Sequence, residues 1–205
     1  MDLDRGTKLV IHLGMTGKLL LGGGAKPGRY THAVFTLDKG ALLYDDMRQF
    51  GRIEVSDGLP ARVAALGPDP LEVDFEEFAV RLKSHASKIK PLLLNQKFLR
   101  GLGNIYCDEA LFRARIHPLA AVSRLSLRRA LRLYRAIVET LKEAVAGRGS
   151  SISDYVDADG QCGGFQERHR VYQRTGQPCV VCGRPVRRIV VAQRGTHFCP
   201  RCQLS

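Results

Sequence analysis

The sequence predicts an α+β protein with a β-rich N-terminal part, a helical middle part and a metal-binding hairpin near the C-terminal end. Three observations lead to this prediction. Short apolar runs divided by glycine-rich turns fill the first 57 residues, apolar residues recur every three to four positions between 126 and 145, and two Cys-x2-Cys pairs occur between 179 and 202. The expected divisions are a strand region at 1–57, a linker at 58–72, a helical domain at 73–148, a flexible loop at 149–170 and a zinc finger at 171–205.

The first 57 residues contain apolar runs of strand length. Each run stops at glycine or at a turn sequence, and Asp38-Lys39-Gly40 separates two runs at the spacing of a hairpin. Such runs favour antiparallel pairing in a small sheet with a thin core. The expected strands lie at residues 8–13, 18–21, 32–37, 41–44 and 51–55.

The middle of the chain reads as helices at 74–82, 88–95, 104–115 and 126–145. Asn104 is the expected N-cap of the third helix, and the connection from 96 to 103 contains two glycines. The fourth helix should bury one apolar face, formed by Leu127, Leu131, Tyr134, Val138, Leu141 and Val145. Its arginines Arg128, Arg129, Arg132 and Arg135 fall largely on other faces, where a solvated surface and a DNA-facing surface are both open interpretations.

Four cysteines have the spacing of a structural zinc site. Cys179 and Cys182 form one Cys-x2-Cys pair, Cys199 and Cys202 form another, and sixteen residues separate them. Each pair can deliver two thiolates from a tight turn, and four thiolates satisfy tetrahedral Zn²⁺. Two disulfides are the alternative, which the absence of a secretory signal disfavours. The intervening residues predict a hairpin with its turn near Arg194-Gly195, while Cys107 and Cys162 lie outside the set.

The positive charge is concentrated in two segments. The chain has a net charge of +12; residues 79–148 carry 15 basic and 4 acidic side chains, and residues 161–205 carry 8 basic and 1 acidic side chain. Such asymmetry indicates a polyanionic partner, most simply nucleic acid. No apolar run approaches the roughly 20 residues that a membrane helix needs, so we expect a cytoplasmic protein with no membrane partner.

Several motifs, taken in order, resemble the formamidopyrimidine-DNA glycosylase / endonuclease VIII family, and the bacterial formamidopyrimidine branch more closely than endonuclease VIII. The resemblance covers essentially the whole chain. The motifs are Ile11-His12-Leu13-Gly14-Met15-Thr16-Gly17, Asp46-Met47-Arg48-Gln49-Phe50-Gly51, Leu66-Gly67-Pro68-Asp69-Pro70-Leu71, Ile89 to Gln96 with Gly101 to Tyr106, and Ala192 to Thr196 inside the zinc hairpin.

The resemblance implies a truncated N-terminal antiparallel β-sandwich, a helix–two-turns–helix domain and one structural Zn²⁺. It also implies base-excision repair of double-stranded damaged DNA by a monomer associated with the bacterial nucleoid: removal of oxidised purines such as formamidopyrimidine and 8-oxoguanine, followed by abasic-site cleavage. Met15 and Arg48 would fill the gap left by the extruded base, and Phe50 would wedge into the base stack. Asn104, Lys90 and Arg194 would hold phosphates, with Arg194 also assigned to δ-elimination; Tyr30, His32, His85 and Lys88 are secondary candidates for DNA contact.

Part of the family pattern is not found in these 205 residues. The family's nucleophilic proline, its neighbouring glutamate and its lysine for β-elimination have no counterpart, since Met1 is followed by Asp2. We therefore expect this polypeptide to form no Schiff base with damaged DNA. A misassigned start or a fragment of an ordinary enzyme, a shortened relative that binds DNA without cleaving it, and an unrelated zinc-ribbon module that binds RNA or protein are the three explanations.

Overall fold

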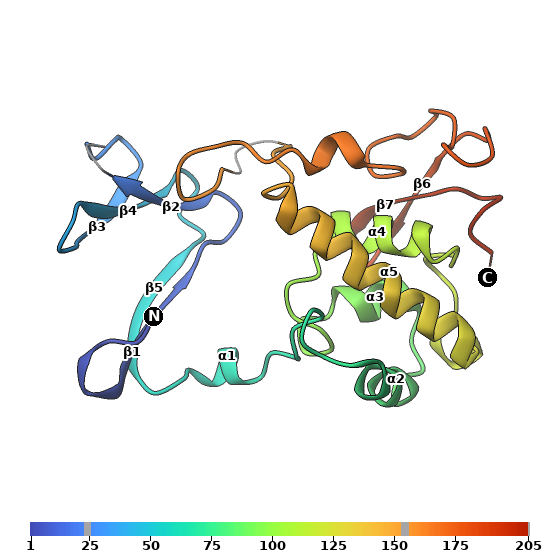
Figure 1. Cartoon of the computed structure of the whole chain (residues 1–205), viewed down its shortest axis with the longest axis horizontal. Coiled ribbons are helices and arrows are strands. Elements are labelled where there is room, and N and C mark those ends of the chain that lie inside the picture. Colours follow the sequence, from blue (N-terminus) through green and yellow to red (C-terminus); the bar gives the residue numbers. More distant parts are fainter. Residues whose placement is uncertain (23–25, 153–155, 205) are drawn as a thin grey trace. The chain divides into compact units, whose positions relative to one another are not determined.

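The computed structural model describes residues 1–22, 26–152 and 156–204, and these fall into two units (Figure 1). Met1–Ala64 and Ala146–Glu167 form the first, here called the strand unit. Ala65–Val145 and Arg168–Ser205 form the second, here called the helical unit. Each unit is described by itself.

The strand unit contains two antiparallel sheets. β1 (Thr7–His12) pairs with β5 (Arg52–Asp57), and β4 (Ala41–Asp46) lies between β2 (Gly17–Gly22) and β3 (Thr31–Thr36). The five expected strands are therefore all present and antiparallel. Among the described residues, only three hydrophobic side chains of these strands are buried, namely Leu9, Leu43 and Tyr44, which agrees with the thin core expected from five short strands.

Short elements complete the strand unit. The 3-10 turn η1 (Asp4–Gly6) precedes β1, and the short helix α1 (Ala61–Ala64) lies inside the predicted linker. After the helix α5 (Leu127–Ala146) the chain returns to this unit: the Leu21 amide donates to the Ala158 carbonyl at 2.9 Å, and the Asp157 carboxylate accepts from the amides of residues 159 and 161. The 3-10 turn η3 (Phe165–Arg168) follows. Residues 153–155 of the predicted loop lie outside the described residues.

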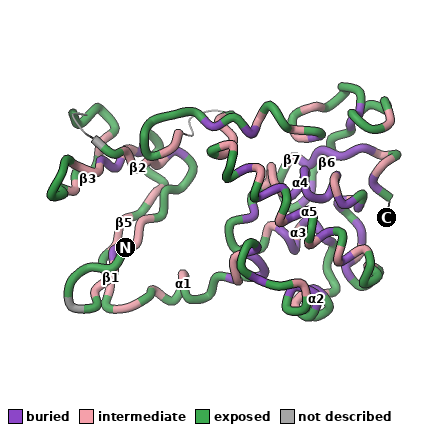
Figure 2. Tube along the Cα trace, in the orientation of Figure 1, coloured by how far each residue is buried: buried purple, intermediate pink, exposed green. Residues whose placement is uncertain are grey.

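The helical unit holds most of the buried side chains, as Figure 2 shows for α3, α4, α5 and β7. Its helices are α2 (Phe75–Lys83), α3 (Ile89–Leu94), α4 (Asn104–Arg113) and α5 (Leu127–Ala146), with the 3-10 turn η2 (Val122–Arg124) between the last two. Asp74 is the N-cap of α2, and its carboxylate accepts the Glu77 amide at 2.8 Å. One apolar cluster joins the four helices and includes Phe78, Leu93, Leu102, Leu111, Leu133 and Ile137.

The buried face of α5 differs from the predicted one. The structure buries Leu133, Ile137, Leu141 and several small residues, whereas Leu127 is 58% exposed and Val145 is 68% exposed. The prediction of the buried face used only large apolar residues and did not include alanine or threonine. Ala130, Ala136, Thr140 and Ala144 belong to the buried face together with the large residues Leu133, Ile137 and Leu141.

Two boundaries also differ by one or two residues. The N-cap of α4 is Gly103, so Asn104 is the first helical residue and its side chain is free to reach elsewhere. The hairpin strands are β6 (Arg187–Val191) and β7 (Arg194–Phe198), with Val191 paired to Arg194. The turn is therefore Ala192-Gln193, two residues before the predicted turn. Both residues have positive φ, 48° and 59°, as a two-residue type I′ turn requires.

Candidate metal centre and nucleic-acid interface

The four predicted ligands converge at the base of the hairpin. The Sγ atoms of Cys179, Cys182, Cys199 and Cys202 all lie within 4.8 Å of one another. The sulfur–sulfur distances are 3.9 Å for Cys179–Cys202 and 3.4 Å for Cys182–Cys199. Zinc at about 2.3 Å from each sulfur sets edges of about 3.8 Å, whereas a disulfide needs about 2.0 Å. The geometry fits one structural Zn²⁺ and excludes the disulfide alternative in this structure.

Buried polar side chains attach the zinc finger to α4. The Glu109 carboxylate accepts the amides of Arg170, Val171 and Tyr172 at 2.8–2.9 Å. Burial raises the pKa of Glu109, and the three amide bonds oppose that rise. On the other side, Gln203 donates to the Ile116 carbonyl and accepts from the Cys199 amide. The metal centre is therefore fixed to the helices by hydrogen bonds as well as by apolar contact.

Lys90 does not reach the surface, so the prediction that it contacts DNA is wrong for this structure. Its side chain is 0% exposed, and its Nζ atom lies 2.5 Å from Asp108 Oδ1. The other Asp108 oxygen accepts the His197 amide at 2.8 Å. Lys90, Asp108 and His197 form a buried network, named here the Lys–Asp–His network, that joins α3, α4 and β7. Sequence spacing could not show that the lysine points into the core.

The start of α4 lies beside the hairpin, as the contact of α4 with β7 in Figure 1 shows. Asn104 Nδ2 donates to the Gly195 carbonyl at 3.0 Å, next to the exposed Arg194. The Asn104 Oδ1 atom is buried and has no partner among the described residues. We call Asn104 and Arg194 the phosphate clamp, because they are the two residues near this turn for which the resemblance predicts phosphate contacts.

The connection before α4 is held by a glutamine that the sequence did not single out. Gln96 Oε1 accepts the Gly101 amide at 2.8 Å, and Gln96 Nε2 donates to the Leu102 carbonyl at 3.1 Å. Gly101 has a φ of 79° and Gly103 has open space around its Cα. The turn therefore presents backbone without side chains in front of the clamp.

A second exposed cluster lies in the strand unit. Met15 is 68% exposed and Phe50 is 56% exposed, although both are apolar. The Arg48 guanidinium lies 4.6 Å from the Phe50 ring centroid and 3.7 Å from the Met15 sulfur. The structure thus brings together the three residues predicted to insert into DNA, Met15 and Arg48 in the gap of the extruded base and Phe50 in the stack. We call them the wedge cluster.

The buried carboxylate of Asp46 supports the loops that carry the wedge cluster. Asp46 Oδ1 accepts the Thr16 hydroxyl at 2.5 Å and the Arg48 amide at 3.3 Å; Oδ2 accepts the Gly51 amide at 2.8 Å. Burial alone would raise the pKa of Asp46, but these hydrogen bonds outweigh it and lower the pKa to about 2. Asp46 therefore stays ionised and fixes both ends of the 46–51 loop.

Gly14 permits the close approach of the other loop. Its φ is 64°, and a Cβ there would lie 2.9 Å from the Phe50 carbonyl carbon. Any larger residue would separate the Met15 turn from the Phe50 turn. The glycine is thus needed for the wedge cluster to form.

We expect Asp46→Asn to destabilise the strand unit by about 2 kcal/mol at neutral pH. The pKa of Asp46 falls from 3.8 to about 2 on folding, so its stabilisation is full well above pH 3.8 and is lost as pH falls through about 2. Urea titrations followed by the Met15 methyl resonance at about pH 6, 4 and 2.5 measure the difference. A difference that stays constant with pH would contradict this role.

The four secondary candidates for DNA contact differ in how far their polar groups are exposed to solvent. Tyr30 is 41% exposed, with the Arg29 guanidinium 5.5 Å from its ring centroid. His32 Nε2 is bonded to the Asp46 carbonyl at 2.9 Å, and the His85 ring is held edge-on to Phe98. Lys88 is exposed just before α3. Tyr30 and Lys88 are the two that present free polar groups to solvent.

Comparison with known proteins gives matches along the chain. The model described as "Formamidopyrimidine-DNA glycosylase N-terminal domain" matches residues 1–53, "Formamidopyrimidine-DNA glycosylase H2TH domain" matches 66–156, and "Zinc finger found in FPG and IleRS" matches 176–204. Proteins named formamidopyrimidine-DNA glycosylase are 61% identical in Solibacter usitatus and 49% identical in Thermus thermophilus, each over 98% of this chain and 75% and 77% of the relative.

Solved structures of formamidopyrimidine-DNA glycosylases are also similar to this chain. The crystal structure of the MutM (Fpg) protein from Thermus thermophilus has a TM-score of 0.89 and 48% identity over 98% of this chain and 77% of that chain. Lactococcus lactis Fpg in complex with abasic-site DNA has a TM-score of 0.85 and 36% identity over 98% and 76%. The chain spans about three quarters of the length of these relatives.

The helix–two-turns–helix domain and the four-cysteine finger define a zinc-containing DNA-repair protein of the α+β class. Identities of 44–61% over nearly the whole chain then decide the family. The chain belongs to the formamidopyrimidine-DNA glycosylase family, the DNA glycosylases of base-excision repair. The interpretation as an unrelated zinc-ribbon module is therefore wrong. Within the described residues, no helix is both long and apolar enough to cross a membrane.

Proposed function

We propose that these 205 residues supply the DNA-binding part of an activity on oxidised purines, such as formamidopyrimidine and 8-oxoguanine, in duplex DNA, with abasic-site lyase activity as the accompanying reaction. The wedge cluster is the observation that carries the proposal. Similar solved structures from Lactococcus lactis were determined with DNA containing Fapy-dG or an abasic site. Such substrates need the damaged nucleotide out of the stack and something in its place.

The wedge cluster has the chemistry for that replacement. Met15 and Phe50 offer flexible and flat apolar surface, while the Arg48 guanidinium over the Phe50 ring can bond to a base edge. Exposing two large apolar side chains costs solvation unless a partner covers them. An unstacked base step is a partner with matching apolar faces, which supports insertion into DNA.

The phosphate clamp holds the backbone in this proposal. Arg194 can make two parallel hydrogen bonds to one phosphate, and the Gly101–Gly103 backbone lets a strand approach the start of α4. Lys90 supports the clamp from below through Asp108 and His197 and makes no contact itself. We further propose that Arg194 assists δ-elimination, and that Tyr30 and Lys88 add contacts.

The similar proteins named formamidopyrimidine-DNA glycosylase come from bacteria such as Solibacter usitatus and Thermus thermophilus. We propose a monomer in the cytoplasm, associated with the nucleoid. In this proposal residues 1–57 carry the wedge cluster, residues 73–148 form the helix–two-turns–helix domain and residues 171–205 form the finger. Residues 58–72 and 149–170 connect these parts. Binding to a short duplex is the property that the described residues can be tested for directly.

The proposal predicts a preference for abasic-site duplex over intact duplex and over structured RNA. The abasic gap removes the cost of extruding a base, so the wedge cluster can insert at once. Fluorescence anisotropy with the three labelled probes at about 0.1 M salt measures the order. Equal affinity for all three probes would contradict the proposal.

In the same assay we expect Arg194→Ala to weaken abasic-duplex binding about tenfold, the cost of one charged hydrogen-bonding group. The matched control is Gln193→Ala, which alters the same turn and removes no charge. It should bind as the wild type does. An equal loss in both variants would assign the effect to the turn and would contradict a phosphate contact by Arg194.

A further inference from the structure

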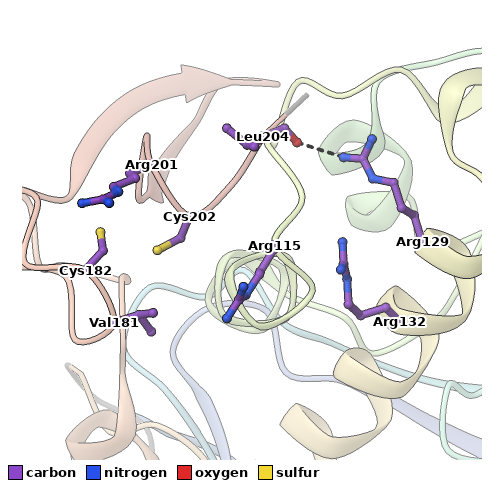
Figure 3. Close-up of a pocket in the computed structure, with 8 residues that line it drawn as sticks. All are labelled: Arg115, Arg129, Arg132, Val181, Cys182, Arg201, Cys202 and Leu204. Carbon is purple, nitrogen blue, oxygen red and sulfur yellow. Dashed lines mark hydrogen bonds between the residues drawn. The ribbon is translucent and has the colours of Figure 1, made fainter.

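Arginines crowd a surface of the helical unit that the proposed function does not use. A cavity of about 660 Å³ is lined by Arg115, Arg129, Arg132 and Arg201 beside the zinc knuckles (Figure 3). A second cavity, of about 390 Å³, shares Arg132 and adds Arg128 and Arg135. We name these six residues the arginine surface; Arg201 also lines a third cavity with two more arginines of the finger.

The charges of the arginine surface are not neutralised within the chain. Among the described residues, none of the six forms a salt bridge; Arg129 donates to the Leu204 carbonyl at 2.9 Å. The carboxylate that lines the second cavity, Glu139, is engaged by Arg113. Burial, followed by the charges of Arg129, Arg115 and Arg128, lowers the pKa of Arg132. Such like-charge crowding is relieved by a bound anion.

The arginine surface is separate from the phosphate clamp. Asn104 begins α4, whereas Arg115 follows its last turn, and a helix of ten residues is about 15 Å long. Arg194 lies at the turn of the hairpin, whereas Arg201 lies between the zinc ligands at its base. Arg115 and Arg201 are therefore at the far ends of the two elements that carry the phosphate clamp, and the other four arginines lie on α5.

The lining indicates what kind of anion fits. Adjoining cavities that share arginines offer a row of charges, which suits a polymer of phosphates better than one small phosphate. The residues that line the three cavities include no aromatic side chain. Single-stranded nucleic acid and RNA loops are usually held by stacking on aromatic rings. A duplex backbone requires only the row of guanidinium groups.

We propose that the arginine surface binds the phosphate backbone of a second DNA duplex while the phosphate clamp holds the first. The protein then joins two DNA segments through one chain. This proposal rests on the proposed function for the first duplex, whereas the second duplex is bound by the arginine surface. The two can be told apart, because the arginine surface can fail to bind the second duplex while binding of the abasic duplex is retained.

Energy transfer between two short duplexes tests it with the full 205-residue chain. A donor-labelled abasic duplex saturates the clamp, and an acceptor-labelled undamaged duplex is then titrated. We expect transfer with the wild type and roughly tenfold weaker binding of the second duplex for Arg132→Gln/Arg201→Gln, with a salt slope less steep by about 2. Binding of the abasic duplex alone should stay unchanged. Sedimentation confirms one protein per complex.

Two further variants separate the explanations. Arg128→Gln/Arg132→Gln leaves the zinc knuckles untouched and should show the same loss. Arg62→Gln/Arg81→Gln removes the same charge from residues that pair with Glu54 and Glu77, and should retain transfer. Absence of transfer in the wild type, equal loss in this control, or stronger displacement of the second duplex by an RNA hairpin than by duplex DNA would overturn the proposal.

Discussion

Cys199→Ser should remove the metal from this protein and disorder the hairpin that carries Arg194. Cys199 is buried, and its sulfur lies 3.4 Å from that of Cys182. A serine hydroxyl replaces a thiolate that the tetrahedral site needs, and structural zinc contributes about 10–16 kcal/mol to the folding of isolated zinc fingers. We expect zinc content to fall from one ion per chain to a small fraction of that, measured on the purified protein by a colorimetric chelator.

The loss should extend to DNA binding. The hairpin places Gly195 against Asn104, so a disordered finger separates the two halves of the phosphate clamp. Cys162→Ser is the matched control, because Cys162 is exposed and lies in the strand unit. It should keep both zinc and abasic-duplex affinity. Unchanged zinc content in Cys199→Ser would contradict the assignment of the ligand.

The zinc site was predictable because its information is local. A Cys-x2-Cys turn sets the distance between two sulfurs by itself, and the chain needs only to bring two such turns together. The wedge cluster was predictable for a different reason: it came from the resemblance, since composition alone favours core packing for Met15 and Phe50. The structure supports the resemblance by leaving both side chains exposed.

Errors arose where the direction of a side chain depends on tertiary packing. Lys90 stands on a short helix whose exposed face cannot be found from six residues. The predicted buried face of α5 was displaced around the helix from the observed one, which combines Leu133, Ile137 and Leu141 with Ala130, Ala136 and Ala144. The turn was placed at a glycine, whereas Ala192 and Gln193 adopt the left-handed region that glycine or asparagine usually occupies. That backbone is strained and holds Arg194 at the strand end.

Buried polar supports were missed altogether. Asp46, Gln96, Glu109 and Gln203 fix the wedge loops, the glycine turn and the finger, yet each looks like an ordinary polar residue in the sequence. Their partners are mostly backbone groups, some only a few residues away and others, such as the amides bonded to Glu109, more than sixty residues along the chain. No pairing of residue types marks such contacts, so only the three-dimensional structure reveals them.

The Lys–Asp–His network makes the strongest prediction for stability. Asp108→Ala leaves the Lys90 ammonium buried without a counter-charge and the His197 amide without an acceptor. Breaking a buried pair from one side costs about 3–5 kcal/mol. This is a large share of the roughly 5–15 kcal/mol that stabilises a typical domain. Urea denaturation of the zinc-loaded protein, followed by helical circular dichroism, measures the loss.

The exposed pair Arg81–Glu77 on α2 provides the control, because it has the same charges in water. Glu77→Ala should cost less than about 0.5 kcal/mol. The double variant Lys90→Met/Asp108→Leu removes both charges and should recover part of the loss, though the His197 amide stays unpaired. If Asp108→Ala costs no more than Glu77→Ala, the Lys90 ammonium has access to water in solution, and a direct role for Lys90 at DNA phosphates would return.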